Sequence, residues 1–154
     1  MRLPGIDRLS SIKPVAVFLE SSHSELAKQV ESFCKHELSN ETEAQSDKEV
    51  RSAARQWLKL VGAKGVLAPL AVEDLRGLCL TREAIASYSP LVDTVVAIQA
   101  LVATSLQLAG SKEQQESWLN GIVTGRIMSA FAMTEPEAGS DVAAISTTAA
   151  KDTN

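Results

Sequence analysis

Apolar side chains recur every three or four positions along most of the chain, which is the spacing of an amphipathic α-helix. Leu26, Val30 and Phe33 form one such stripe, with charged residues between them. Polar runs, glycine and proline separate successive stripes. The pattern predicts a mainly α fold, an antiparallel bundle of about five helices followed by one or two short strands. The helices are expected at residues 22–38, 46–62, 75–88, 91–108 and 111–124.

Three pairs of residues have the spacing of a capping box, in which two side chains three positions apart bond each other's backbone N–H groups. These pairs begin at Ser22, Ser46 and Ser111, where we expect helices to start. A break between the third and fourth helices is expected before Pro90, because proline disfavours a helical conformation in the preceding residue.

The segment 91–108 differs from the other predicted helices because large aliphatic side chains occupy nearly its whole circumference. Such a helix is stable only when most of its sides are buried. We expect it to be the central helix of the bundle, or a surface that meets another domain. It has nearly the length of a membrane span, but Asp93, Gln99 and Gln107 interrupt it and basic flanks are missing, so membrane insertion is not expected.

The periodicity changes after the fifth predicted helix. Residues 127–133 (IMSAFAM) are short and apolar on both faces, which favours a buried strand. Residues 145–149 (ISTTA) are rich in β-branched side chains and predict a second strand, followed by a turn at 151–154. Two short strands are not stable alone. We therefore divide the chain into an irregular leader at 1–21, a helical domain at 22–125 and the truncated start of a β domain at 126–154.

Composition narrows the possible partners. The 154 residues are 45% hydrophobic and carry a formal net charge of -4, which argues against nucleic acid or an anionic membrane as the main partner. Cys34 and Cys79 lie in helical patterns and are expected to be buried, reduced thiols. No group of residues has zinc spacing, so no metal site is expected, and His23 is expected to be exposed. Without a recognisable targeting segment, we expect a cytoplasmic location.

The residues after the first predicted strand have the composition of a ligand-binding turn. Thr134 stands at the strand end, and Gly139 can take a positive φ that lets neighbouring N–H groups converge on an anion. Ser140 adds a hydroxyl, and Asp141 can cap the next turn. This construction suits a ligand with a flat polar ring and a phosphate. From these residues alone, a hairpin loop without a ligand is at least as probable.

The string FAMTEPEAGSD at residues 131–141 resembles the signature segment of the acyl-CoA dehydrogenase family. That segment runs aromatic, any residue, hydrophobic, Thr-Glu-Pro, any residue, Ala-Gly-Ser-Asp. Residues 108–125 are similar to the helix that precedes the signature, and LCLTREAIA at 78–86 is similar to a helix of the family's N-terminal domain. The resemblance covers most of residues 22–152.

The resemblance implies an N-terminal helical domain, a middle β domain and a C-terminal helical bundle, with FAD between the last two. By motif position, Phe131, Ala132, Met133 and Thr134 would line the flavin, with the Thr134 hydroxyl on its pyrimidine edge. Ser140 would contact the FAD pyrophosphate and the pantetheine side of an acyl-CoA or acyl-carrier thioester. The implied reaction is α,β-desaturation, in which a carboxylate removes the α-proton and hydride passes to the flavin.

The chain departs from the family pattern in two respects. Residues 67–72 replace a glycine-rich stretch, which leaves the acyl-chain specificity open. Nothing corresponds to the rest of the β domain or to the C-terminal bundle, which carries the family's catalytic glutamate. No glutamate here takes over that role, and Glu135 and Glu137 are expected to be structural or solvated.

We therefore predict the N-terminal portion of an FAD-dependent acyl-CoA dehydrogenase that is inactive alone. Its expected partners are an acyl thioester, a second copy or a complementing dehydrogenase chain, and an electron-transfer flavoprotein. Two alternatives stay open. One is a non-catalytic helical module that pairs through the apolar face of 91–109, and the other is one subunit of a split dehydrogenase whose second chain supplies the base.

Overall fold

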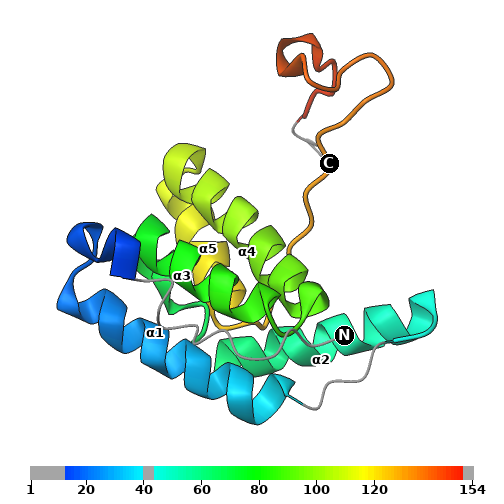
Figure 1. Cartoon of the computed structure of the whole chain (residues 1–154). Helices are drawn as coiled ribbons and strands as arrows, with labels where there is room; N and C mark the ends of the chain where they lie inside the picture. The colour runs from blue at the N-terminus through cyan, green and yellow to red at the C-terminus, as the bar shows by residue number, and fades with distance from the viewer. Residues whose placement is uncertain (1–12, 40–43, 151–154) are drawn as a thin grey trace.

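The computed structural model describes residues 13–39 and 44–150, and α-helices account for most of this part of the chain (Figure 1). The predicted mainly α bundle is confirmed. Leader residues 1–12, loop residues 40–43 and the predicted turn at 151–154 lie outside the described residues. The α-helices are α1 (Ser21–Phe33), α2 (Asp47–Ala63), α3 (Leu75–Ala86), α4 (Pro90–Ala109) and α5 (Lys112–Val123). A π-helical turn at Cys34–Leu38 follows α1, and short 3-10 helices form at Lys13–Phe18, Ala68–Val72 and Val142–Ala144.

Two of the three predicted helix starts are confirmed by hydrogen bonds. Ser46 Oγ accepts a hydrogen bond from Glu49 N–H at 3.4 Å and caps α2. At α5, Ser111 Oγ accepts from Gln114 N–H at 3.3 Å, and Gln114 Oε1 accepts from Ser111 N–H at 2.8 Å. This reciprocal pair is the predicted capping box. Pro90 occupies the first turn of α4, where the N–H that proline lacks would have no partner in the helix.

The third predicted start, Ser22, is wrong, because Glu20 is the N-cap of α1. Glu20 N–H donates to His23 Nδ1 at 2.9 Å. The other ring nitrogen, Nε2, therefore carries the hydrogen and donates to Asp74 Oδ1 at 3.1 Å, at the start of α3. His23 is only 3% exposed, which corrects the expectation of an exposed histidine. Since both ring nitrogens are hydrogen-bonded, the ring can be buried at little cost. The expected burial is found for Cys34 but is wrong for Cys79, which is exposed on α3.

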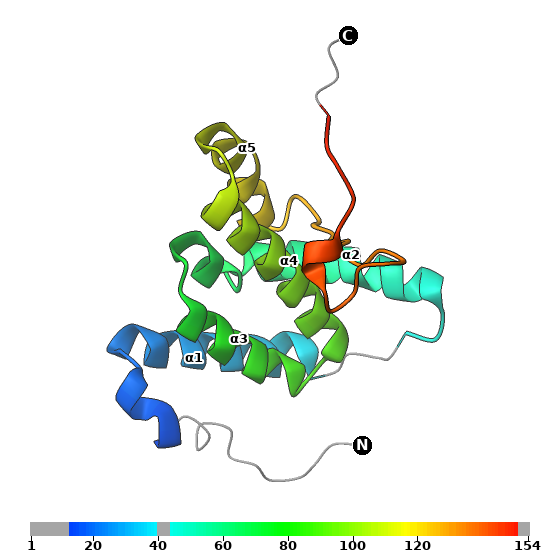
Figure 2. The same ribbon diagram turned by 90° about the horizontal axis from the view of Figure 1, so that it is seen from above.

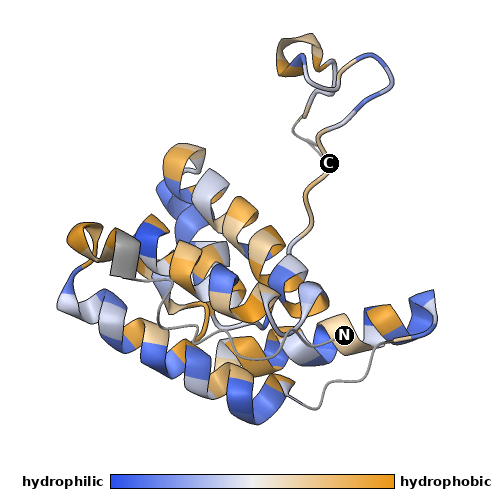
Figure 3. Cartoon of the chain, in the orientation of Figure 1, coloured by the Kyte–Doolittle hydropathy of each residue, from blue (hydrophilic) through white to orange (hydrophobic). Residues whose placement is uncertain are grey.

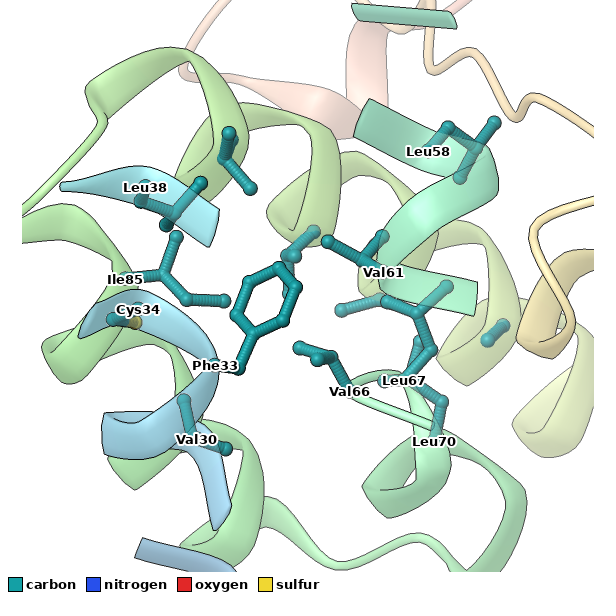
Figure 4. Packing of buried hydrophobic residues seen from close by; sticks show 14 of the residues in the cluster. Val30, Phe33, Cys34, Leu38, Leu58, Val61, Val66, Leu67, Leu70 and Ile85 are labelled. Carbon is teal, nitrogen blue, oxygen red and sulfur yellow. The ribbon is translucent and has the colours of Figure 1, made fainter. Parts of the chain in front are cut away.

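The core is centred on Phe33, from the last turn of α1 (Figure 4). Ile85 of α3 lies on one side of the ring and Val61 of α2 on the other, and both are fully buried. The connection between α2 and α3 contributes as well, since Leu67 is only 1% exposed. The buried cluster consists of Val30, Phe33, Cys34, Leu38, Leu58, Val61, Val66, Leu67, Leu70, Ile85, Val92, Val96, Ala100, Ala103 and Ile122.

Helix α4 buries one face and leaves the other open. Much of its length is apolar in Figure 3, yet Leu101 is 46% exposed and Leu108 is 79% exposed. The expected burial on most sides is therefore not met within the described residues, whereas a surface that meets another domain fits this exposure. The buried residues of α4 are Val92, Val96, Gln99, Ala100 and Ala103.

Polar side chains within α4 bind the neighbouring elements. Arg82 of α3 donates two hydrogen bonds of 2.8 Å to the Asp93 carboxylate, and this pairing raises the pKa of the Arg82 guanidinium. Gln107 Nε2 donates to the Leu70 carbonyl at 2.7 Å. By length and composition α4 could cross a membrane, and among the described residues its buried face packs against α2, α3 and α5.

Two glycines allow α2 to approach the chain that follows α5. Gly125 has a φ of 67°, and a Cβ there would overlap the Leu58 carbonyl oxygen. A Cβ at Gly62, within α2, would overlap the Thr124 carbonyl oxygen. Both positions therefore need glycine for packing, and Gly125 needs it for its backbone conformation as well.

Neither predicted strand forms in the described part of the chain. Residues 127–133 and 145–149 have no regular secondary structure. Between the end of α5 and residue 150, the one isolated backbone bridge joins Glu135 and Ala138. Figures 1 and 2 show the C-terminal segment leaving the bundle, with no other segment paired alongside it. Apolar and β-branched residues favour extended backbone, but a strand also needs a hydrogen-bonding partner, which the described residues do not provide.

Substituting Ile85 with alanine tests the core. Ile85→Ala removes buried methyl groups and leaves a cavity, so we expect a loss of about 2–5 kcal/mol in the free energy of unfolding. Urea denaturation followed by circular dichroism measures it. The matched control is Leu108→Ala, which removes a side chain of the same size from an exposed site and is expected to change stability by about 0.5 kcal/mol or less. Equal losses in both variants would contradict this description of the core.

Candidate functional site

The signature segment is attached to the bundle by the buried side chain of Gln99. Gln99 is 1% exposed, and its Nε2 donates to the carbonyls of Ile122 at 3.0 Å and Ile127 at 2.9 Å. Ser129 N–H donates to Gln99 Oε1 at 2.7 Å. One amide thus fixes both the end of α5 and the first turn of chain beyond it. These hydrogen bonds offset the free-energy cost of burying the polar side chain of Gln99.

Gln99 was not predicted as a site residue. The sequence identified it only as a polar interruption of an apolar helix. A usable signal was present, because Gln99 lies at helical spacing from Val92, Val96 and Ala103, all of which are buried. An amide on the buried face of a helix must find partners, so a role in fixing a neighbouring segment could have been inferred.

Phe131 and Ala132 line an open groove beside the end of α4. The groove has a volume of about 430 Å³, and its lining is mainly apolar. Phe131 is 45% exposed and Met133 is 42% exposed. The structure therefore brings two of the predicted flavin-lining residues to one groove, whereas Met133 and Thr134 are not part of its lining. The lining residues are Val102, Ser105, Leu106, Ala109, Gly110, Ala130, Phe131 and Ala132.

Thr134, Gly139 and Ser140 lie together on a separate loop. A tight turn opens it, in which Glu135 N–H donates to the Ala138 carbonyl at 2.9 Å and Ala138 N–H donates back at 3.2 Å. Thr134 and Ser140 are exposed, and their hydroxyls bond to no other described residue. These two hydroxyls are therefore available to a ligand.

The conformation expected at Gly139 is not found. Its φ is not positive, since only Gly65 and Gly125 have positive values among the described glycines. A Cβ at Gly139 would also meet no atom within 4 Å. Within this chain, neither backbone conformation nor packing requires glycine there. By contrast, the predicted cap at Asp141 is confirmed, because its Oδ1 accepts from Ala143 N–H at 3.2 Å.

The side chain of Glu135, at the start of the loop, closes it by binding two residues at its far end. Its carboxylate accepts hydrogen bonds from the backbone N–H and the hydroxyl of Ser146, at 2.9 Å and 2.8 Å. Thr147 donates in the same way, from its N–H at 2.9 Å and from its hydroxyl. The hydrogen bonds from Thr147 and then from Ser146 lower the pKa of Glu135 to about 2. Glu135 is thus ionised at neutral pH with both oxygens occupied, which makes it unsuitable as a general base.

The loop offers neutral donors to an anion and no cation. The N–H groups of Gly139, Ser140 and Asp141 have no hydrogen-bond partner among the described residues. Residues 127–150 contain three carboxylates, on Glu135, Glu137 and Asp141, and neither lysine nor arginine. Backbone N–H groups and hydroxyls can hold a phosphate, but the surrounding negative charge opposes it. Tight binding therefore needs further contacts from outside this loop.

A comparison with known protein families identifies the helical part of the chain. Residues 20–126 match the N-terminal domain of acyl-CoA dehydrogenases. The chain belongs to the acyl-CoA dehydrogenase family. This match covers α1 to α5, and the signature segment follows it directly.

Curated relatives support the same assignment. The rat very long-chain specific acyl-CoA dehydrogenase, a mitochondrial protein, is 32% identical over 121 residues, which are 73% of this chain and 18% of the relative. The acyl-CoA dehydrogenase FadE12 of Mycobacterium tuberculosis is 37% identical over 49% of this chain and 19% of its own length. The acyl-CoA dehydrogenase ApdG of Emericella nidulans is 57% identical over 27% of this chain and 10% of its own length. The chain thus spans less than a fifth of the length of each relative.

Replacing Gln99 tests how the segment is attached. Gln99→Leu keeps the volume but removes the partner of the Ile127 carbonyl and of the Ser129 N–H, while the Ile122 carbonyl keeps its bond from Gly125 N–H. We expect a loss of at least about 2 kcal/mol in the free energy of unfolding and faster amide exchange at Ser129. Gln29→Leu, the same change at an exposed position of α1, is the control and should have little effect. An unchanged exchange rate at Ser129 in the Gln99 variant would refute the attachment.

Proposed function

We propose that this chain is the N-terminal portion of an FAD-dependent acyl-CoA dehydrogenase and supplies part of the flavin site. The observation that carries the proposal is the loop at 134–141, which bears the family signature. The hydroxyls of Thr134 and Ser140 and the N–H groups of residues 139–141 bond to no other described residue. Unpaired hydroxyls and N–H groups fit the polar ring edge and phosphates of a flavin dinucleotide. The groove beside Phe131 offers an apolar surface close to the same segment.

Each site residue has a distinct task in this proposal. Thr134 would donate its hydroxyl to the polar edge of the flavin ring. Ser140, with the free N–H groups beside it, would bind the pyrophosphate and the pantetheine side of an acyl thioester. Bound FAD would supply the hydride acceptor for α,β-desaturation of that thioester. Phe131, Ala132 and Met133 would cover the flavin and exclude water from one side.

The described loop does not supply everything that the reaction further needs. Glu135 is committed to the loop, and Glu137 is exposed on the same turn, so neither carboxylate is poised to remove an α-proton. The loop also carries no cation to balance the phosphates. We therefore expect the isolated chain to be inactive and to bind FAD weakly. Contacts from the remainder of a dehydrogenase, on the same or another polypeptide, would complete the site, and electrons would then pass to an electron-transfer flavoprotein.

A second candidate rests on the open face of α4. Leu101 and Leu108 are exposed on a helix whose opposite face is buried, and such a face suits a helical partner. A non-catalytic module that pairs with another dehydrogenase chain, or with a second copy, would use this face. The two candidates differ in one observable, because the module would associate with its partner without increasing FAD binding.

Ser140→Ala tests the proposed flavin site. The assay mixes the chain with a polypeptide that carries the middle β domain and C-terminal bundle of an acyl-CoA dehydrogenase, and FAD binding is followed by flavin fluorescence. Loss of one hydrogen bond to a charged group costs about 1.5–3 kcal/mol, so the dissociation constant should rise on the order of tenfold to a hundredfold.

Ser52→Ala, at an exposed position of α2, is the matched control and should leave FAD affinity unchanged. If the unsubstituted chain adds nothing to FAD binding by the complementing polypeptide, the proposed function is wrong. If it does add binding but Ser140→Ala has the affinity of the control, Ser140 is not part of the site.

A further inference from the structure

We propose that Glu135 is a positioning residue that clasps the loop from 135 to 147 and thereby holds the donors of Thr134 and Ser140 in place for the dinucleotide. The inference rests on the proposed function and deepens it, by assigning a role to a glutamate that touches neither cofactor nor substrate. Thr134 lies directly beside the closed loop and Ser140 lies within it. The shape of the loop therefore determines how their two hydroxyls are arranged.

The clasp consists of a carboxylate that satisfies four donors at once. Each oxygen of Glu135 binds one residue, Oε2 binding Ser146 and Oε1 binding Thr147, and each partner donates both its N–H and its hydroxyl. The partners are 11 and 12 positions further along the chain. Hydrogen bonds to an ionised acceptor are stronger than those between neutral groups. Only a carboxylate presents two acceptor oxygens in this geometry, since the amide of glutamine would point donors at one of the two partners.

Among the described residues, only the Glu135 side chain bonds the start of this loop to residues 146 and 147. The loop extends away from the bundle in Figure 1. From residue 130 to residue 150, no hydrogen bond to a described helix of the bundle is found. Ala138, 1% exposed, is the single buried residue in this stretch. Because hydrophobic packing is nearly absent there, internal hydrogen bonds must determine the loop's shape, and the Glu135 carboxylate accepts four of them.

Glu135 stays ionised at neutral pH. A pKa lowered to about 2 means that the clasp stabilises the closed loop at any pH above the ordinary glutamate value, and weakens only as the pH falls toward 2. The clasp is therefore a constant feature of the loop at neutral pH, rather than a switch. Its contribution is to order the site before a ligand arrives.

The test compares Glu135→Gln with Glu137→Gln in the full chain. Both variants remove one carboxylate from the same loop, but Glu137 has no side-chain hydrogen bond with a described residue. Amide exchange measured by NMR should become on the order of tenfold faster at Ser146 and Thr147 in Glu135→Gln and should stay unchanged in Glu137→Gln. Amides of α4 serve as the folding control. Unchanged exchange at Ser146 and Thr147 in both variants overturns the clasp.

A double-mutant cycle separates a specific contact from a general loss of stability. Thr147→Val removes the hydroxyl that donates to Glu135. If the two residues act through this contact, Thr147→Val should change the exchange rate at Ser146 much less in a chain that already carries Glu135→Gln. Additive effects would mean that the two residues act independently, which contradicts the proposal.

The positioning role is then measured as FAD affinity in the complemented assembly. Glu135→Gln should weaken binding on the order of tenfold, whereas Glu137→Gln should stay within about twofold of the unsubstituted chain. Faster exchange with unchanged FAD affinity would overturn the positioning role and leave the proposed function intact. If the unsubstituted chain adds no FAD binding, the proposed function fails and the positioning role fails with it, while the exchange data still decide whether the clasp exists.

Discussion

The buried amide of Gln99 joins two parts of the molecule that are held together by different forces. The bundle depends on apolar burial around Phe33, where close packing makes one arrangement of the helices favourable. From residue 130 to residue 150 there is little burial, and hydrogen bonds supply most of the order. Arg126 and Ile127 also donate their N–H groups to the Gly121 carbonyl, but Ser129 is the last residue before the signature segment with a hydrogen bond to a helix, and it bonds to Gln99. The direction in which the signature segment leaves the bundle therefore depends strongly on this side chain.

The helices could be predicted because their signals are local. The stripe through Val30 and Phe33 and the pair Ser111 and Gln114 each lie within one or two turns, and the structure bears them out. The start of α1 was missed because its N-cap, Glu20, donates its N–H to the ring of His23, and that ring is held by Asp74, 51 positions away. The exposed face of α4 could not be predicted either, because the hydrophobicity of a helix indicates that it must be buried but not which partner buries it.

The candidate site was predictable in its composition and less so in its geometry. The family string pointed to Thr134 and Ser140, and both have free hydroxyls. The strands expected around them do not form, because a composition that favours extended backbone cannot supply a neighbouring strand. The hydrogen bonds of Glu135 were hidden for a similar reason. Its partners lie in a polar run with no periodicity, and sequence spacing does not reveal which distant N–H groups a carboxylate will reach.

The contact between Gly62 and Gly125 has a consequence for how the sequence can diverge. A methyl group at either position would wedge apart the same two stretches of backbone, so the two sites form one steric unit. Once α2 had moved outward to accommodate a first substitution, a second would meet less resistance, and the combined effect would be smaller than the sum. Because Gly125 also has a positive φ, homologous chains should keep glycine there, and should lose Gly62 only together with a wider spacing at this crossing.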